Sequence, residues 1–185
     1  MQVLILGLVL WTAAHLFRRV LPGLRARLGE GPGKMLVAVL SLAAVFLMVI
    51  GYRRAEVDPV YTPMDGIGHL NNLLMLIALF LFGVSHSKGR VKAMVRHPML
   101  WSVVIWAVAH LLVNGDLASL VMFGWLGLWA LVEIVLINAQ VEWKRPAPGP
   151  LRSDAIALVI ALVLYGLIAG VHIWLGYNPF QGTYG

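Results

Sequence analysis

Long apolar runs alternate with short segments rich in Gly, Pro and charge along the whole chain. A helix that crosses a bilayer needs about 20 predominantly apolar residues, and runs of roughly that length recur through the sequence. We expect spanning helices at roughly 2–18, 34–52, 67–84, 98–114, 117–140 and 153–176. The pattern therefore predicts an all-α protein, a polytopic membrane helix bundle of about six transmembrane helices.

The segments 21–34, 55–66 and 144–152 have the composition of connectors between these helices. The first apolar run has its positive charges after it, which favours a retained helix over a cleaved signal peptide. No internal repeat is evident, so we expect a single domain over residues 1–185.

Composition supports the bilayer as solvent, because 61% of the residues are hydrophobic and only 12% are charged. A net charge of +6 would suggest a nucleic acid partner in a soluble protein. Here the basic residues cluster between the apolar runs, where they set membrane topology, so we expect no nucleic acid partner. Cys is absent, which excludes thiolate metal ligands and Cys nucleophiles. Any metal must therefore be held by His, carboxylate, Met or backbone groups.

Lys and Arg concentrate in cytoplasmic loops of membrane proteins. Of the 14 here, 12 lie in or beside the connectors that follow the first, third and fifth expected helices. These are Arg18, Arg19, Arg25, Arg27, Lys34, Lys88, Arg90, Lys92, Arg96, Lys144, Arg145 and Arg152. The bias predicts that both termini lie on the non-cytoplasmic side.

This orientation gives each histidine a depth. His69, His110 and His172 share an outer layer, whereas His15, His86 and His97 belong to the cytoplasmic half. Histidines at helix ends usually reach the interface, and we interpret His86 and His172 in this way. His97 precedes Pro98, so "RHP" is as consistent with a helix start as with a functional histidine. An ionisable group inside a span is usually functional. His15 and His110 are therefore candidate metal ligands, followed by His69.

Other polar groups in the spans have expected partners. Trp106 and Asn114 lie four residues either side of His110, and the Asn114 amide is a candidate to fix the imidazole tautomer. Asp116 is placed to cap the next helix. Glu133, deep in a span, is expected to be neutral or paired with His or Arg.

Four segments, "HLFRR", "RHPMLW", "WAVAHLLVNGDLASLVMFG" and "HIWLGYNPF", resemble the NnrU family of bacterial membrane proteins, and the likeness extends over nearly the whole chain. The resemblance implies a multi-pass protein of the bacterial inner membrane, associated with nitrite and nitric oxide reduction in denitrification. It also implies kinship with the plant and cyanobacterial 15-cis-ζ-carotene isomerase, a membrane enzyme with haem b.

Carried onto this chain, the resemblance implies that His15 and His110 are the axial haem ligands, with His69 as the substitute. Plant isomerases have Cys directly after the Trp of this block, where this chain has Ala107. A cis-trans isomerase reaction on a polyene, with the iron as Lewis acid, is the activity implied.

A haem between helices needs apolar walls and one or two imidazoles, which a bundle core can supply. The expected cofactor site comprises His15, His110, His69, Trp106, Asn114 and Arg96. Arg96, Arg18 and Arg19 are candidates to pair with haem propionates, although ordinary snorkelling to the interface explains all three. Expected partners are haem, an apolar small molecule or polyene, the lipid bilayer and a respiratory or denitrification protein.

Two other function classes fit parts of the pattern. "RHP" at a helix start also occurs in membrane methyltransferases that use S-adenosylmethionine, although here the following aromatic is Trp101 and the chain returns to the membrane after "VEWKRP". The other alternative is a non-enzymatic assembly subunit of a respiratory complex, in which the histidines line a partner interface.

Overall fold

The computed structural model describes residues 1–181 and contains helices and connectors over that part of the chain, with no strand. The long helices are α1 (Gln2–Val20), α3 (Glu30–Arg53), α4 (Ile67–His86), α6 (Pro98–Val113), α7 (Leu117–Gln140) and α8 (Leu151–Trp174). Two short helices, α2 (Pro22–Arg27) and α5 (Arg90–Met94), lie in the connectors. The six predicted spans are therefore confirmed as helices, while α2 and α5 were not predicted.

Five of the long helices, α1, α3, α4, α7 and α8, are long and apolar enough to cross a membrane, so the chain is a multi-pass membrane protein. The predicted fourth span, α6, is equally apolar but has only 16 residues. It rises about 24 Å, which is less than the hydrocarbon thickness of about 30 Å. Pro98 occupies its first turn, as "RHP" predicted, and Asn114 ends it.

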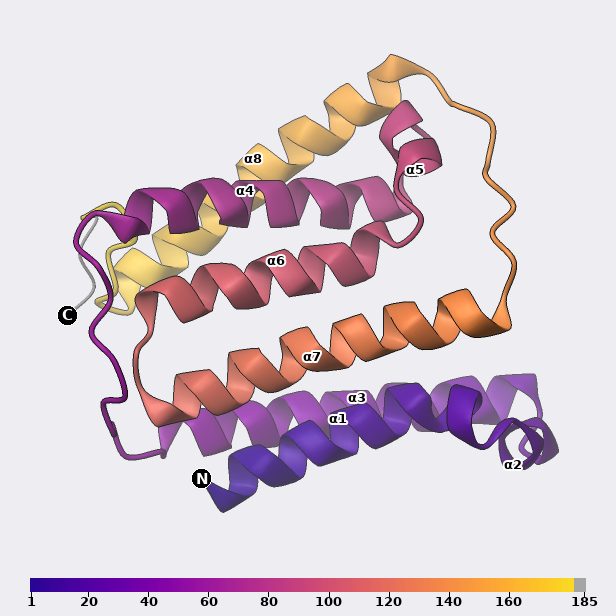
Figure 1. Cartoon of the computed structure of the whole chain (residues 1–185), viewed down its shortest axis with the longest axis horizontal. Coiled ribbons are helices and arrows are strands. Elements are labelled where there is room, and N and C mark those ends of the chain that lie inside the picture. The colour runs from indigo at the N-terminus through magenta and orange to yellow at the C-terminus, as the bar shows by residue number, and fades with distance from the viewer. Residues whose placement is uncertain (182–185) are drawn as a thin grey trace.

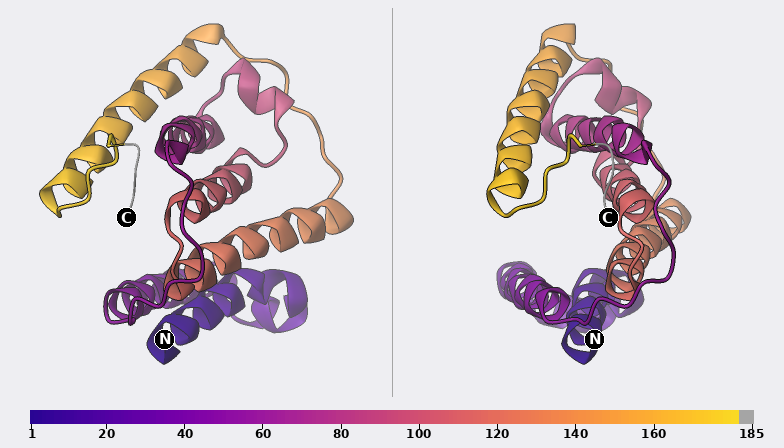
Figure 2. Two further views of the ribbon diagram at one scale, coloured as in Figure 1. Left: turned by 60° about the vertical axis from the view of Figure 1, so that its left-hand side comes forward. Right: turned by 90° about the vertical axis from the view of Figure 1, so that its left-hand side faces the viewer.

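The helices form a curved row in the order α3, α1, α7, α6, α4, α8 (Figures 1 and 2). Each contacts its neighbours in the row, and the right-hand view of Figure 2 shows the row as an open arc with α3 and α8 as its arms. The helix α1 begins, and α8 ends, at one end of the bundle, which we call the terminal end (Figure 1). The opposite end carries the basic connectors, and we call it the basic end.

Small residues let α1 and α3 approach closely. A Cβ added at Gly51 would lie 2.3 Å from the backbone nitrogen of Leu4, and one at Gly7 would lie 2.8 Å from the nitrogen of Met48. Without a water-driven force inside lipid, such close backbone packing is what holds spanning helices together. The buried cluster at this contact, Leu4, Leu8, Met48, Ala118 and Leu126, joins α1 and α3 to α7.

At the terminal end, the connector 55–66 packs on the tight turn between α6 and α7. The backbone N–H groups of Val60 and Tyr61 donate to the Gly115 carbonyl at 2.7 and 3.1 Å. A Cβ at Gly115 would lie 1.8 Å from the backbone carbonyl oxygen of Tyr61, so this position requires glycine. Asp116 caps α7 by accepting from the Ser119 backbone N–H at 2.9 Å, as predicted.

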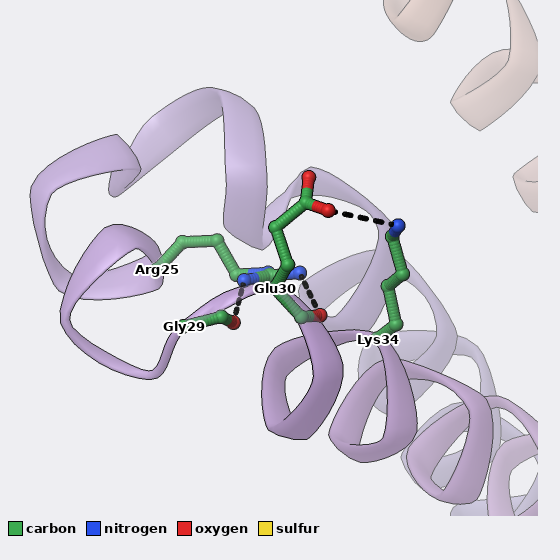
Figure 3. Close-up of polar contacts among 4 residues, drawn as sticks. All are labelled: Arg25, Gly29, Glu30 and Lys34. Carbon is green, nitrogen blue, oxygen red and sulfur yellow. Dashed lines mark hydrogen bonds and ion pairs between the residues drawn. The ribbon is translucent and has the colours of Figure 1, made fainter.

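At the basic end, polar contacts fasten the connectors to the helices. Arg25 of α2 donates to the Gly29 carbonyl at 2.8 Å, beside the exposed Glu30–Lys34 ion pair at 3.3 Å (Figure 3). Asp154 of α8 accepts from the backbone N–H of Arg90 at 2.8 Å. This carboxylate fixes the start of α5 against α8.

Candidate functional site

Three of the six histidines share one local geometry. The Nδ1 atoms of His15 and His110 each lie 2.9 Å from the carbonyl oxygen four residues earlier, and that of His172 lies 2.8 Å away. A carbonyl only accepts, so Nδ1 carries the proton in each neutral ring. The lone pair is then on Nε2, the atom that binds a metal when Nδ1 is held in this way.

His110 borders a groove of about 250 Å³ between α4, α6 and α8, which we call the His110 groove. Its lining comprises Met75, Ala78, Leu79 and Phe82 from α4, Ser102, Val103, Trp106 and His110 from α6, and Ile168 and His172 from α8. The walls are thus mainly apolar, with two imidazoles and one hydroxyl among them. Ligand pockets usually measure about 300–1,000 Å³, so the groove can enclose one edge of a larger ligand.

Aromatic rings hold the His110 imidazole in position. Phe123 of α7 stacks on it with centroids 4.5 Å apart, and Trp106 lies 5.0 Å away. The Asn114 amide donates to the His110 backbone carbonyl at 2.8 Å. The prediction that Asn114 fixes the imidazole tautomer is therefore wrong, since the Trp106 carbonyl takes that role and Asn114 closes the helix end instead.

His15 lies in a different setting, the contact between α1 and α7, which we call the His15 seam. Its ring stacks on Trp11 at 4.0 Å and meets the edge of Trp129 at 5.0 Å. In the described part of the chain, the indole N–H groups of Trp11 and Trp129 are buried without a hydrogen-bond partner. Two aromatic rings therefore pack against the partly buried His15 within the seam.

The seam continues towards the basic end with a charge pair. Arg19 Nε lies 3.8 Å from Glu133 Oε2, and both side chains are largely shielded from solvent. Arg19 and His15 are one turn apart on α1, as Glu133 and Trp129 are on α7. Pairing of Glu133 with Arg or His was predicted, and Arg19 is the partner.

The structure holds His15 and His110 at different levels. Their α7 contacts, Trp129 and Phe123, are six residues apart and point to different faces of that helix. No hydrogen bond or ring contact within residues 1–181 joins the two histidines.

The remaining predicted residues are dispersed. His69 is exposed in the first turn of α4 and does not line the His110 groove. Arg96 lies at the basic end, where it donates to the Val141 carbonyl and borders a separate pocket. Residues 1–181 contain no group of three or more His, Cys, Asp or Glu side chains suited to a bare metal ion.

The residue that sequence reasoning undervalued is His172. It was interpreted as a helix-end residue, yet it shares the groove with His110. Its assignment to the same outer layer as His110 was the available signal. Which helices pack together depends on contacts far apart in the sequence, and α4 brings α6 and α8 to one groove.

Comparison with known proteins gives one match. The family model described as "NnrU protein" matches residues 3–179. No curated protein and no solved structure matches the chain.

Proposed function

This chain belongs to the NnrU family, and from that premise we propose that it is a haem b protein of the bacterial inner membrane with His110 as an axial ligand. The observation that carries the proposal is His110 itself. Its Nε2 is left free by the Nδ1 bond to Trp106, and the ring borders a largely apolar groove.

The residues of the groove fit a porphyrin edge. Trp106 and Phe82 supply aromatic walls, and Met75 and Leu79 supply aliphatic ones. Phe123 restricts rotation of the imidazole from the α7 side. When bound, haem b would supply an iron that changes oxidation state or binds a small ligand or double bond. The protein contributes orientation, an apolar setting and exclusion of water.

The second axial position has two candidates. His172 borders the same groove, whereas His15 is the ligand implied by resemblance. His69 is the third choice. Binding by His15 requires the α1 and α6 histidines to approach one iron from levels about 9 Å apart, the spacing of their contacts on α7, and hence a movement of α1 relative to α6. Binding by His172 would use two imidazoles that already border one groove.

The cellular role proposed is the one associated with the family, in nitrite and nitric oxide reduction during denitrification. The sharper chemical proposal is cis-trans isomerisation of a polyene beside the haem. The apolar lining of the His110 groove supports an apolar ligand in general.

Haem binding is tested by purifying the protein from cells supplied with haem and recording its absorption spectrum and haem content. Wild-type protein should show a Soret band with about one haem per chain, and His110→Ala should lose it. His86→Ala, an exposed histidine outside the groove, is the matched control. Among the other candidates, the variant that keeps haem but changes its spin state identifies the second ligand.

A folded, colourless wild-type protein without iron would overturn the haem proposal. Thermal stabilisation of that colourless protein by S-adenosylmethionine would favour the methyltransferase alternative, and its absence the assembly subunit. Isomerase activity has its own test, incubation of cis-polyenes with the reduced, haem-loaded protein. Unchanged substrates would reject the isomerase and leave haem binding intact.

A further inference from the structure

A second pocket lies at the basic end, between the end of α4, the short helix α5 and the start of α6. Its volume is about 360 Å³, and we call it the basic pocket. Its polar lining comprises Ser85, His86, Lys92, Arg96 and His97, and its apolar lining comprises Pro98, Met99 and Leu100. Among residues 1–181, no carboxylate lines it.

The charges in this pocket lack a negative counterpart. Lys92 donates to the Ser85 carbonyl and Arg96 to the Val141 carbonyl, both neutral acceptors. The ion pairs found in residues 1–181 are Arg19–Glu133 and Glu30–Lys34, and neither borders the pocket. The nearby Asp154 carboxylate is engaged by the backbone N–H groups of Arg90 and Val91.

Two further features, neither of which carries a full charge, make the pocket more favourable for an anion. The helix α6 begins in the pocket, and the partial positive charge of a helix start favours an anion. His97 is oriented by Asn138, whose Oδ1 lies 2.9 Å from its Nε2. The pocket therefore presents several donors and no competing acceptor of full charge.

We propose that the basic pocket binds the phosphate of an anionic glycerophospholipid at the membrane interface. Basic pockets between spanning helices on the cytoplasmic side are suited to such head groups. A phosphodiester accepts from Lys92 and Arg96 together, and the charge-assisted bonds are stronger than the present bonds to carbonyls.

The surroundings favour a lipid over a soluble anion. Pro98, Met99 and Leu100 give the pocket an apolar side. Beside it, the Phe82 ring meets that of His86 with centroids 5.4 Å apart, and this 43% exposed side chain can lie along a lipid tail. A free phosphate ion would use the cations and leave these apolar surfaces without a role.

The test measures thermal unfolding of the full chain in neutral detergent with short-chain phosphatidylglycerol, phosphatidylcholine or inorganic phosphate. At saturating phosphatidylglycerol the wild type should gain about 5 °C in Tm. Lys92→Gln/Arg96→Gln should lose this gain. Arg27→Gln/Arg152→Gln, which removes two exposed charges from the same end, should keep it.

Four outcomes would overturn the proposal: no gain in the wild type, the same gain in Lys92→Gln/Arg96→Gln, the same gain with inorganic phosphate alone, or an equal gain with phosphatidylcholine, which would reject an anionic head group. If Lys92→Gln/Arg96→Gln does not fold, wild-type protein is labelled with a photoreactive phosphatidylglycerol. Labelling within residues 85–100 supports the proposal, and labelling confined to other segments overturns it.

Discussion

His15 and His110 have the same local hydrogen bond, with Nδ1 2.9 Å from the carbonyl four residues earlier, but their surroundings differ. Across from His15, α7 presents Trp129, which together with Trp11 packs against the imidazole. Around His110, the neighbouring helix α4 contributes the small side chain of Ala78 and α8 contributes Ile168 and His172, and a groove remains. The side chains of the neighbouring helices, more than the histidine's own helix, decide whether an imidazole has space for a ligand.

The comparison also concerns charge. The His15 seam contains a largely shielded ion pair, Arg19–Glu133, one turn from the histidine, whereas the His110 groove is lined by neutral side chains and imidazoles. A buried ion pair adds little net stability, and its best-attested role is to fix the register between two helices. The seam therefore fits a structural contact, and the groove fits a binding site.

The largest expected effect comes from opening the seam. Trp129→Ala removes the ring that contacts both Trp11 and His15 and should lower the free energy of unfolding by about 3–5 kcal/mol. Trp101→Ala is the control, because that side chain is 40% exposed and should cost under about 1 kcal/mol. Equal losses in detergent unfolding experiments would show that the seam is no better packed than the lipid-facing surface.

A smaller effect is expected from breaking the charge pair. Arg19→Gln leaves Glu133 buried without its partner and should cost about 1–3 kcal/mol. Adding Glu133→Gln should restore part of the loss, because a neutral pair carries a lower desolvation cost. Lys34→Gln, at the exposed Glu30 pair, should change stability by about 0.5 kcal/mol or less. An Arg19→Gln effect no larger than that of Lys34→Gln would remove the charge difference between the two regions.

The smallest effect concerns the hydrogen bonds of the Tyr61 hydroxyl to the end of α6 near His110, which we call the Tyr61 clamp. The Tyr61 hydroxyl donates to the Leu111 and Asn114 carbonyls, so Tyr61→Phe should cost about 0.5–1.5 kcal/mol, while Thr62→Val should not. Burial, with a smaller contribution from Asp116, raises the pKa of Tyr61. The clamp should thus persist below about pH 10 and weaken only as the pH rises through the folded-state pKa. Loss of the Tyr61-dependent stability near neutral pH would contradict this.

The helices were predictable because each apolar run is bounded by residues that start or stop a helix. Pro98 and Asp116 mark helix starts, and their predicted roles are confirmed. The helices α2 and α5 were missed, since they are short and lie in basic connectors without apolar periodicity.

Contacts between helices were less accessible to sequence reasoning. The need of Glu133 for a positive partner followed from its depth, but the choice of Arg19 depends on how α1 lies along α7. The groove shared by His110 and His172 depends on α4 lying between α6 and α8. Such arrangements are set by packing over long sequence separations, which a periodic pattern does not encode.

The central proposal is that one edge of the haem lies in the His110 groove and not in the His15 seam. It is tested most directly by comparing haem content in Val103→Phe, which fills the groove, with that in Trp129→Phe, which alters the seam while keeping a ring there. We expect Val103→Phe to lose haem while remaining folded and Trp129→Phe to retain it. Full haem content in Val103→Phe together with loss in Trp129→Phe would contradict it.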